Sequence, residues 1–562
     1  MNSEPAQRFR RTAERVLDAM LASAPETATE LGDHRFDDRL SDLSDAGVAE
    51  RVSLLREAAT ALDDLDDTEL DVPDRVDLEI LRTAVTREAW TAQELAVHAH
   101  DPLLHLPGDA LYPLLVREGA DPVQRLTALT ARLAGVPERL RVAREVLHDM
   151  PRVHVETAAG QARGLEAMLG DVDGLAATDA GLAPQLLRAR DAAAGALREH
   201  AGWLDAQLPV SDGDPRLGPD RYAAKVWYQL DSEVGSDALL TRAESDLQAV
   251  EEAIAEVASR IAAAPPQPGQ VRQVLDRLAA DAPVDDVTIL PLCEQALAEA
   301  TERVRTLDLV TVPDEILADG VRIIVMPPAR RGVAVAYADP PGPLEPAADG
   351  GPQPTFFAVS PTPEGWSPDR VASFYREYNG HMLRNLTVHE AMPGHVLQLA
   401  HAARYRGSTR VRQALWSGPF VEGWAVYAEE LMATAARYTP GRPDRDAVLM
   451  QMLKMRLRTT INAILDVRVH ARGMTQGEAM RLMVDRGHQE EGEAVGKWRR
   501  ALLTSAQLAT YYVGAHEVTE IVRAQSASTP AATTRQVHDA VLAHGSPPPR
   551  HLRTLLGLAS DA

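Results

Sequence analysis

The sequence predicts a mainly α-helical protein with one small β-sheet. Most of the chain repeats apolar residues every three or four positions, the spacing of a helix that buries one face. Only residues 320–360 carry short β-branched or aromatic runs between Pro/Gly clusters. The 562 residues exceed the roughly 250 to 300 residues at which single cores stop growing. We therefore expect two lobes, or one large helical body with a cleft.

The clearest helical stripe begins at Ser236 and ends at Ala264, before two consecutive prolines. Its apolar residues alternate in steps of three and four: Leu240, Ala243, Leu247, Val250, Ile254, Val257 and Ile261. Similar stripes predict five more helices: Pro5–Ala24, Gly47–Leu62, Val123–Leu147, Ala183–Leu208 and Ala447–Val469. We expect a break at Pro137, because an interior proline lacks the amide donor of the helix.

Three apolar runs predict the strands of the small sheet: Val321–Met326, Val333–Tyr337 and Phe356–Ser360. The stretch Pro340–Pro354 is rich in Pro and Gly and predicts a loop at its edge. A boundary is expected within Gln207–Asp220, which separates an N-terminal helical section, residues 1–210, from a C-terminal section, residues 221–562. The alternative is one continuous domain.

The bulk composition excludes several classes of partner and site. A net charge of −24 without a Lys/Arg-rich run disfavours nucleic acid, and Cys293 alone cannot form an internal disulfide or a cysteine-rich metal site. No apolar stretch approaches the ~18 residues of a membrane span. Asp18 interrupts the apolar part of Met1–Thr29, which favours an amphipathic helix over a signal peptide. We expect no membrane contact and a cytoplasmic location.

The segment Leu386–Gln398 reads LTVHEAMPGHVLQ and contains candidate metal ligands. Zinc hydrolases with an H-E-x-x-H motif place two His ligands on one helix face, with a Glu that takes a proton from the zinc-bound water. Here His389 and His395 are six residues apart, about 240° on a regular helix. We predict that Pro393 and Gly394 break the helix and turn His395 back toward His389. By itself, this spacing also fits a structural role.

A second motif, Phe420–Leu431, reads FVEGWAVYAEEL and offers a third ligand in Glu422. Zinc with two His ligands commonly takes a carboxylate and keeps the fourth position for water. In an alternative interpretation, three glutamates form the solvent-exposed face of a helix: Glu422, Glu429 and Glu430. Gly423 and Trp424 argue against this for Glu422, because Gly permits close approach of another helix and Trp favours a buried position.

These motifs resemble those of the bacterial domain-of-unknown-function 885 family, which is itself similar to helical carboxypeptidases of the thermostable carboxypeptidase 1 type. Supporting segments extend the resemblance over nearly the whole chain: Ala28–Asp42, Asp466–His470 and Gln507–Gly514. The resemblance implies that His389, His395 and Glu422 bind the metal and that Glu390 is the general base. The chain departs from the family pattern at Val396, where members often have a second His, and at residues 467–469.

The same resemblance makes Tyr511 and His470 candidates for stabilising the oxyanion of peptide hydrolysis. Tyr511 is preferred to its neighbour Tyr512, because adjacent side chains point in different directions and Tyr511 matches the family position. The alternative is that Tyr511 only packs and that His470 is a core residue oriented by Asp466, four positions earlier on the same helix face.

The function expected from the sequence is zinc-dependent hydrolysis of short peptides by a carboxypeptidase or dipeptidase, with manganese or cobalt as other possible ions. The catalytic section would be residues 221–562, with the small sheet beside the active site and N-terminal helices over the cleft. Two alternatives are a metal-dependent hydrolase of a non-peptide amide or ester, and a non-catalytic helical scaffold. The substrate, exo or endo cleavage and the oligomeric state are not determined by the sequence.

Overall fold

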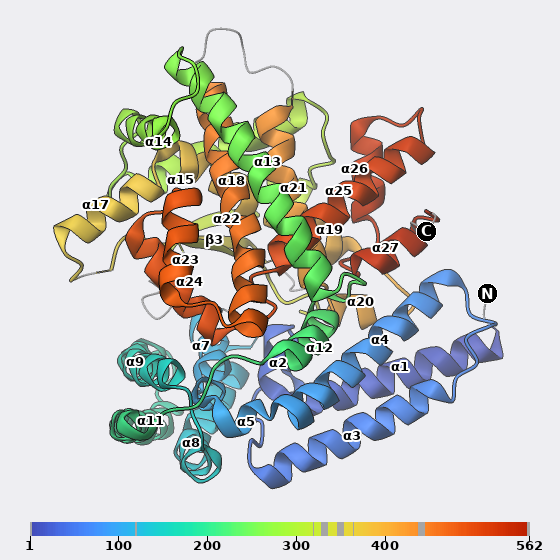
Figure 1. Cartoon of the computed structure of the whole chain (residues 1–562). Coiled ribbons are helices and arrows are strands. Elements are labelled where there is room, and N and C mark those ends of the chain that lie inside the picture. Colours follow the sequence, from blue (N-terminus) through green and yellow to red (C-terminus); the bar gives the residue numbers. More distant parts are fainter. Residues whose placement is uncertain are drawn as a thin grey trace. The chain divides into compact units, whose positions relative to one another are not determined.

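The structure is a computed structural model that describes residues 3–117, 121–317, 320–326, 335–345, 353–363, 365–435 and 444–558. The chain divides into two compact units, both mainly helical (Figure 1). Unit 1 comprises Met1–Pro215, Pro341–Pro352 and Gly407–Leu415, and unit 2 comprises Arg216–Pro340, Gln353–Arg406 and Trp416–Ala562. The predicted fold class, mainly α with a small sheet, is confirmed.

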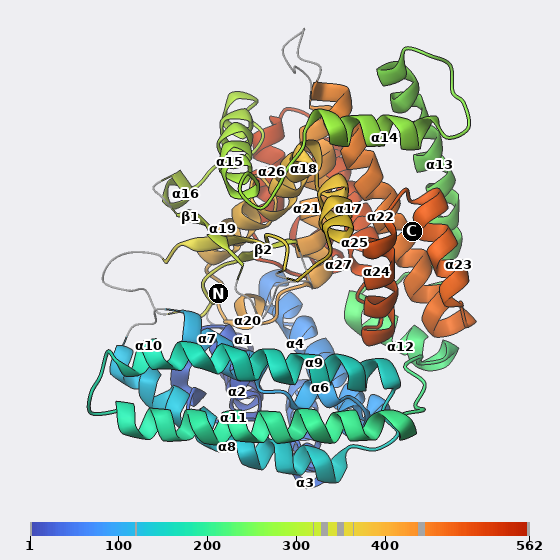
Figure 2. The ribbon, with the colours of Figure 1, turned by 90° about the vertical axis from the view of Figure 1, so that its left-hand side faces the viewer.

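Unit 1 is built from helices alone in its described part. They are α1 (Glu4–Ser23), α2 (Pro25–Glu30), α3 (Asp45–Asp63), α4 (Val72–Trp90), α5 (Val97–His100), α6 (Pro102–His105), α7 (Gly108–Val116), α8 (Pro122–Val146), α9 (Arg152–Met168), α10 (Val172–Ala176), α11 (Ala183–Gln207) and α20 (Val411–Ala414). The long helices α8, α9 and α11 run side by side (Figure 2) and share a core of Leu, Val and Ala. Buried apolar area supplies most of the stability of such a bundle.

The predicted break at Pro137 is wrong, because α8 continues through it to Val146. Leu133, Val136 and Leu140 are fully buried on either side of the proline. An interior proline costs about 3 kcal/mol, whereas fully burying each of these side chains contributes about 1.5–3 kcal/mol. Packing therefore outweighs the lost hydrogen bond.

Two segments distant in sequence belong to unit 1 through buried polar contacts. The Arg412 guanidinium meets the Asp77 carboxylate at 2.6 Å, with both side chains almost fully buried. His34 Nε2 lies 3.1 Å from a Glu345 carboxylate oxygen, and its Nδ1 lies 2.8 Å from Asp37 Oδ2. These contacts connect residues 341–345 and 407–415 to the N-terminal helices.

Unit 2 contains the remaining helices and the sheet. Its helices are α12 (Pro219–Leu230), α13 (Ser236–Ala262), α14 (Gln270–Asp281), α15 (Ile289–Thr306), α16 (Asp314–Leu317), α17 (Pro368–Glu377), α18 (Gly380–Glu390), α19 (His395–Arg404), α21 (Gly418–Thr434), α22 (Asp444–Arg472), α23 (Gln476–Arg481), α24 (Glu491–Leu503), α25 (Thr510–Ser528), α26 (Thr534–Leu542) and α27 (Pro549–Leu555). The predicted long stripe is α13, which packs along α22 (Figure 1).

The sheet has three strands in the order β1-β3-β2. β1 (Val321–Val325) is parallel to β3 (Thr355–Val359), with Val321 opposite Thr355, and β2 (Ala336–Asp339) is antiparallel to β3, with Ala338 opposite Phe357. Each predicted strand has a counterpart, although residues 333–334 of the second prediction and residues 346–352 of the predicted loop lie outside the described residues. β2 forms one edge of the sheet.

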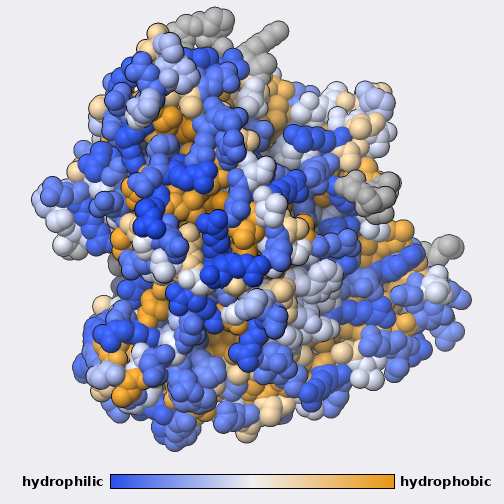
Figure 3. Space-filling model, in the orientation of Figure 1, coloured by the Kyte–Doolittle hydropathy of each residue, from blue (hydrophilic) through white to orange (hydrophobic). Residues whose placement is uncertain are grey.

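The face drawn in Figure 3 is largely hydrophilic, with hydrophobic side chains lying between the polar ones. This agrees with a chain in which charged residues make up 25%. Among the described helices, none combines the length and apolar composition that a membrane span requires.

Candidate metal centre

The HEAMPGH segment forms a break between two helices. α18 starts after its cap Asn379 and ends at Glu390, and α19 starts at His395. The four residues between them turn tightly, and the Gly394 N–H donates to the Val388 carbonyl at 3.0 Å. The Met392–Pro393 peptide bond is cis. The predicted break at Pro393 and Gly394 is confirmed.

Only glycine fits at position 394. A Cβ there would lie 1.9 Å from the His389 carbonyl oxygen and 2.4 Å from that of Val388, both backbone atoms. Trp424 Nε1 donates to the Pro393 carbonyl at 2.8 Å, and its side chain is fully buried. The break is thus fixed both by its own backbone and by α21.

The break brings the two imidazoles together. The ring centroids of His389 and His395 are 4.8 Å apart and the rings are nearly perpendicular, at 86°. Both Nε2 atoms face Glu422 on α21, whose Oε2 lies 3.5 Å from His389 Nε2 and 3.4 Å from His395 Nε2. The three side chains form a group that could hold a metal ion, as the sequence predicted.

The two distances from Glu422 Oε2 to the imidazoles fit a tetrahedral ion. With bonds of about 2.0–2.1 Å to each ligand, a tetrahedron places neighbouring donor atoms roughly 3.3–3.4 Å apart. A direct N–H···O bond would be shorter, at about 2.7–3.2 Å. Within the described part of the chain, Glu422 Oε2 is a buried acceptor without a hydrogen-bond partner. A buried oxygen of this kind needs a cation or a donor.

Glu429 orients the first of these histidines. Its Oε1 lies 2.7 Å from His389 Nδ1, and its Oε2 accepts from Asn385 Nδ2 at 2.6 Å. A carboxylate on the other ring nitrogen fixes the tautomer of a metal-binding His and leaves Nε2 free for the metal. Glu429 is 3% exposed, so the solvated-face alternative is wrong for this residue. The sequence contained a signal for this role: Glu429 lies seven positions after Glu422, so the two share one face of the helix two turns apart.

Two glycines let α21 and α25 pack closely. A Cβ on Gly423 would lie 2.3 Å from the Gly514 carbonyl oxygen, and one on Gly514 would lie 2.0 Å from that of Pro419. This contact brings Tyr511, one turn before Gly514, toward the histidines: its ring centroid is 6.5 Å from that of His389. Tyr512 points elsewhere and donates to Asp246 at 2.6 Å.

Glu390 ends α18 beside the group. Its side chain is buried, and burial raises its pKa, partly offset by the imidazoles of His389 and His395. The backbone of Ala338 in β2 also lowers the pKa of this carboxyl, and α18 packs against β2. The small sheet therefore reaches the group through its edge strand.

Carboxylates outnumber imidazoles in the group, and each shifts the pKa of the others. Burial raises the pKa of Glu422, but the nearby imidazoles of His389 and His395 outweigh it and hold the pKa well below its usual range. Burial lowers the pKa of His389, while Glu422 and Glu429 outweigh it and hold that pKa well above normal. Burial and the charge of Glu422 raise the pKa of Tyr511. Three carboxylates thus surround two imidazoles in a buried space.

The contacts of His470 lie away from these residues. Its Nε2 faces the carbonyl oxygens of Ala501 and Thr504 at 2.9 and 2.8 Å, and its ring stacks on Tyr222 with centroids 5.6 Å apart. The Asp466 carboxylate accepts from the N–H groups of Ala506 and Ala509. These contacts are those of a core histidine, as the alternative expected, but a bond from Asp466 is not seen, because within the described residues His470 Nδ1 has no hydrogen-bond partner.

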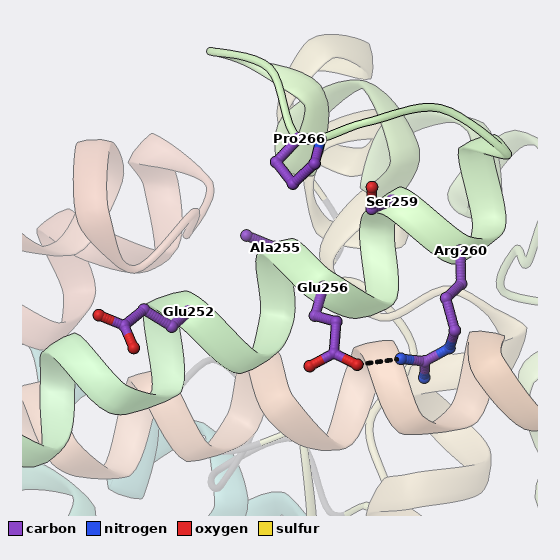
Figure 4. A pocket seen from close by; sticks show the side chains of 6 residues that line it. All are labelled: Glu252, Ala255, Glu256, Ser259, Arg260 and Pro266. Carbon is purple, nitrogen blue, oxygen red and sulfur yellow. Dashed lines mark hydrogen bonds and ion pairs between the residues drawn. The ribbon is translucent and has the colours of Figure 1, made fainter.

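The hollow shown in Figure 4 does not involve the group. It has a volume of about 570 Å³ and is lined by five residues of α13 and by Pro266. None of the candidate metal ligands lines it, and Glu256 and Arg260 form an ion pair within it. It offers no constellation of catalytic side chains.

Comparison with known proteins places the chain in a family. The model of the family described as "Bacterial protein of unknown function (DUF885)" matches residues 25–556. The chain belongs to the DUF885 family. The resemblance seen in the motifs is thereby confirmed for the family, whereas the relation to helical carboxypeptidases stays a prediction. A search of curated proteins finds no match.

Two solved structures share the fold over nearly their whole length. One, from Shewanella oneidensis, is described as a candidate lipoprotein of unknown function and is 24% identical, with a TM-score of 0.80, covering 98% of this chain and 99% of its own. The other, a candidate lipoprotein from Colwellia psychrerythraea, is 14% identical, with a TM-score of 0.80 and 98% of both chains covered. At these identities the likeness establishes the fold only.

Proposed function

We propose that this DUF885 protein is a metal-dependent hydrolase of peptide bonds in short peptides. The observation that carries the proposal is the convergence of His389 Nε2, His395 Nε2 and Glu422 Oε2, at spacings that fit a tetrahedral ion, beside the buried Glu390. Two His and one carboxylate leave one position open for water or substrate, the arrangement of catalytic zinc sites. Zinc is the proposed ion, with manganese or cobalt as the alternatives.

In this proposal Glu390 transfers the protons. A divalent ion held by the three ligands would supply Lewis acidity, which polarises a substrate carbonyl and acidifies water. Glu390 would take a proton from the attacking water and pass it to the leaving amine. The raised pKa of Glu390 suits both steps, because an acid–base group works best with a pKa near the working pH.

Tyr511 is the proposed donor to the developing oxyanion. Its ring lies beside His389, and its raised pKa keeps the phenol protonated at neutral pH. A donor aimed at the carbonyl oxygen stabilises the transition state more than the ground state. His470 is left out of the proposed machinery, because its Nε2 is engaged by backbone carbonyls.

The edge of β2 is the proposed partner for an extended peptide backbone. Among the described strands, β2 pairs with β3 alone, and it packs against α18, which ends at Glu390. A peptide that adds to a strand edge gains main-chain hydrogen bonds irrespective of its sequence. This would deliver the scissile bond next to the metal group.

Metal analysis combined with activity on a mixed peptide library tests the proposal. The protein should be purified without chelator, and we expect about one divalent ion per chain and cleavage that chelator abolishes. If the protein binds metal but hydrolyses only non-peptide amides or esters, the substrate is of that class and the protein is not a peptidase. A chain free of bound metal and inactive after addition of zinc, manganese or cobalt would favour a helical scaffold.

The cytoplasm remains the proposed location. The two solved relatives are described as candidate lipoproteins, which makes the cell envelope the alternative. Fractionation of cells that express the native gene, followed by immunodetection, would separate these two locations.

A further inference from the structure

Helix α24 carries two cations that are not matched by acidic partners. Lys497 and Arg500 are three positions apart and so share one helix face. Lys497 is 5% exposed. Arg500 is half-buried, and its Nη2 donates to Gln507 Oε1 at 2.8 Å and to Tyr511 Oη at 3.3 Å, both neutral groups. Among the described residues, no carboxylate lies within ion-pair distance of either cation.

Neighbouring cations show that acidic partners are available in this region. Arg458 pairs with Glu493, and Lys454 Nζ lies 2.9 Å from Glu377 Oε2. Burial lowers the pKa of Lys497, the charges of Arg458 and Arg500 lower it further, and the weaker effects of Glu493 and Glu377 do not offset this. A chain with 82 acidic and 58 basic residues thus keeps two basic side chains without a directly paired carboxylate at one place. A buried basic group without a paired carboxylate is costly and is commonly retained for a ligand.

The place is next to the metal group. Arg500 touches the phenol of Tyr511, and the Tyr511 ring is 6.5 Å from that of His389. In a peptide cut at its last bond, the terminal carboxylate is one residue from the scissile carbonyl, and one residue spans at most about 3.6 Å. A residue that binds this terminal carboxylate must therefore lie close to His389, His395 and Glu422, separated from them by about the length of one side chain.

We propose that Arg500, supported by Lys497, binds the free C-terminal carboxylate of the substrate and makes the protein a carboxypeptidase. The proposal rests on the proposed peptidase function and names its substrate class. A planar guanidinium suits this task, because it can donate two parallel hydrogen bonds to a carboxylate. The substrate carboxylate would also be a counterion for Lys497, which has none within ion-pair distance among the described residues.

The test compares matched peptides that end in a free carboxylate or in an amide. We expect wild-type protein to prefer the free acid by at least about 100-fold in kcat/KM. Arg500→Gln should lose about 10- to 100-fold on the free acid, the range for a charge-assisted bond, mainly through KM, and should lose about tenfold less on the amide, where only its contact with Tyr511 is removed. Arg500→Lys should recover part of the loss. Arg499→Gln, the exposed neighbour on α24, is the control with the same charge change.

Two further measurements separate the possible failures. Equal losses of Arg500→Gln on acid and amide, as expected for Tyr511→Phe, would mean that Arg500 only positions Tyr511 and would overturn the anchor. Calorimetric binding of N-acetylphenylalanine and its amide works without turnover. Preferential binding of the acid, lost in Arg500→Gln and in Lys497→Met, would support the anchor even if no peptide is cut. Equal binding of the acid and the amide by wild-type protein would overturn the anchor. Metal content and melting temperature that are unchanged in the variants would exclude misfolding.

Discussion

Two histidine pairs in the described chain have almost the same ring geometry but different surroundings. The rings of His389 and His395 have centroids 4.8 Å apart at 86°. Those of His100 and His148, in unit 1, have centroids 4.8 Å apart at 87°. Each pair has an acidic residue within reach, Glu422 and Asp149 respectively, and each trio could hold a metal ion by proximity alone.

The surroundings separate the two groups. The side chains of His148 and Asp149 are 61% and 79% exposed, against 9% and 11% for His389 and His395. Water solvates the first group, so the attraction between its members is worth little. The second group is largely buried, and within the described residues its Glu422 Oε2 has no hydrogen-bond partner.

The hydrogen bonds differ in the same direction. In the exposed group, His148 Nδ1 faces Asp149 and His100 Nδ1 faces the His148 carbonyl, at 3.0 and 3.1 Å. These contacts involve donors and acceptors of the trio itself. In the buried group, His389 Nδ1 hydrogen-bonds to Glu429, which is not a member of the trio. Its Nε2 therefore remains directed at Glu422. Of the two groups, only the buried one therefore combines close donors with burial and with the outside carboxylate that supports a metal-binding histidine.

The largest expected effect distinguishes the two groups by metal content. His395→Ala should lose nearly all bound metal and all hydrolysis, because two ligands hold a divalent ion far less tightly than three. His148→Ala should retain both. Elemental analysis of the purified variants measures the difference. Metal that disappears with His148→Ala and survives His395→Ala would reverse the comparison.

Glu390→Gln should separate metal binding from chemistry. The amide keeps the shape of the side chain but cannot accept a proton, so we expect a loss of about 10²- to 10⁴-fold in kcat with unchanged metal content. Steady-state kinetics on a cleaved peptide measure the loss. Glu430→Gln, a change of the same kind on α21, is the control. Activity within twofold of wild type in Glu390→Gln would assign the base to another residue.

Gly394→Val tests whether the break itself supports the buried group. The side chain would meet two backbone carbonyls, and we expect a loss of about 3 kcal/mol or more in the free energy of unfolding, together with weaker metal binding. Thermal unfolding measures the first effect. Gly160→Val, at an exposed helix position where an added Cβ meets nothing within 4 Å, should be nearly neutral. Equal melting temperatures for the two variants would contradict the conclusion that position 394 requires glycine.

Glu429→Gln should have the smallest effect and sharpen the comparison most. Loss of a supporting carboxylate typically weakens metal affinity 10- to 100-fold, while the three ligands remain. Titration against a metal buffer measures the affinity. Glu430→Gln is again the control, because Glu430 is partly exposed and pairs with Arg456 instead of a histidine of the group. Identical affinities in the two variants would reduce Glu429 to a packing residue.

The local chemistry of the sequence predicted the helices and the break at the metal motif. Periodicity of three and four located α13 to within two residues of its observed end, and the Pro-Gly pair located the change of direction between His389 and His395. Both are properties of neighbouring residues, which hydrogen-bond or clash within one or two turns. The same rule failed at Pro137, where burial of α8 against its neighbours outweighed a local cost.

Contacts between elements distant in the sequence decided the rest. The sequence named the residue types of the group, but the approach of α18, α21 and α25 follows from the fit of Gly423 against Gly514 and of Trp424 against Pro393. That packing brought Glu429 to His389 and turned Tyr511 toward the group, whereas the packing of α22 against α24 placed His470 among core carbonyls. Side-chain convergence depends on how whole helices cross, and a helical repeat records only which face of each helix is buried.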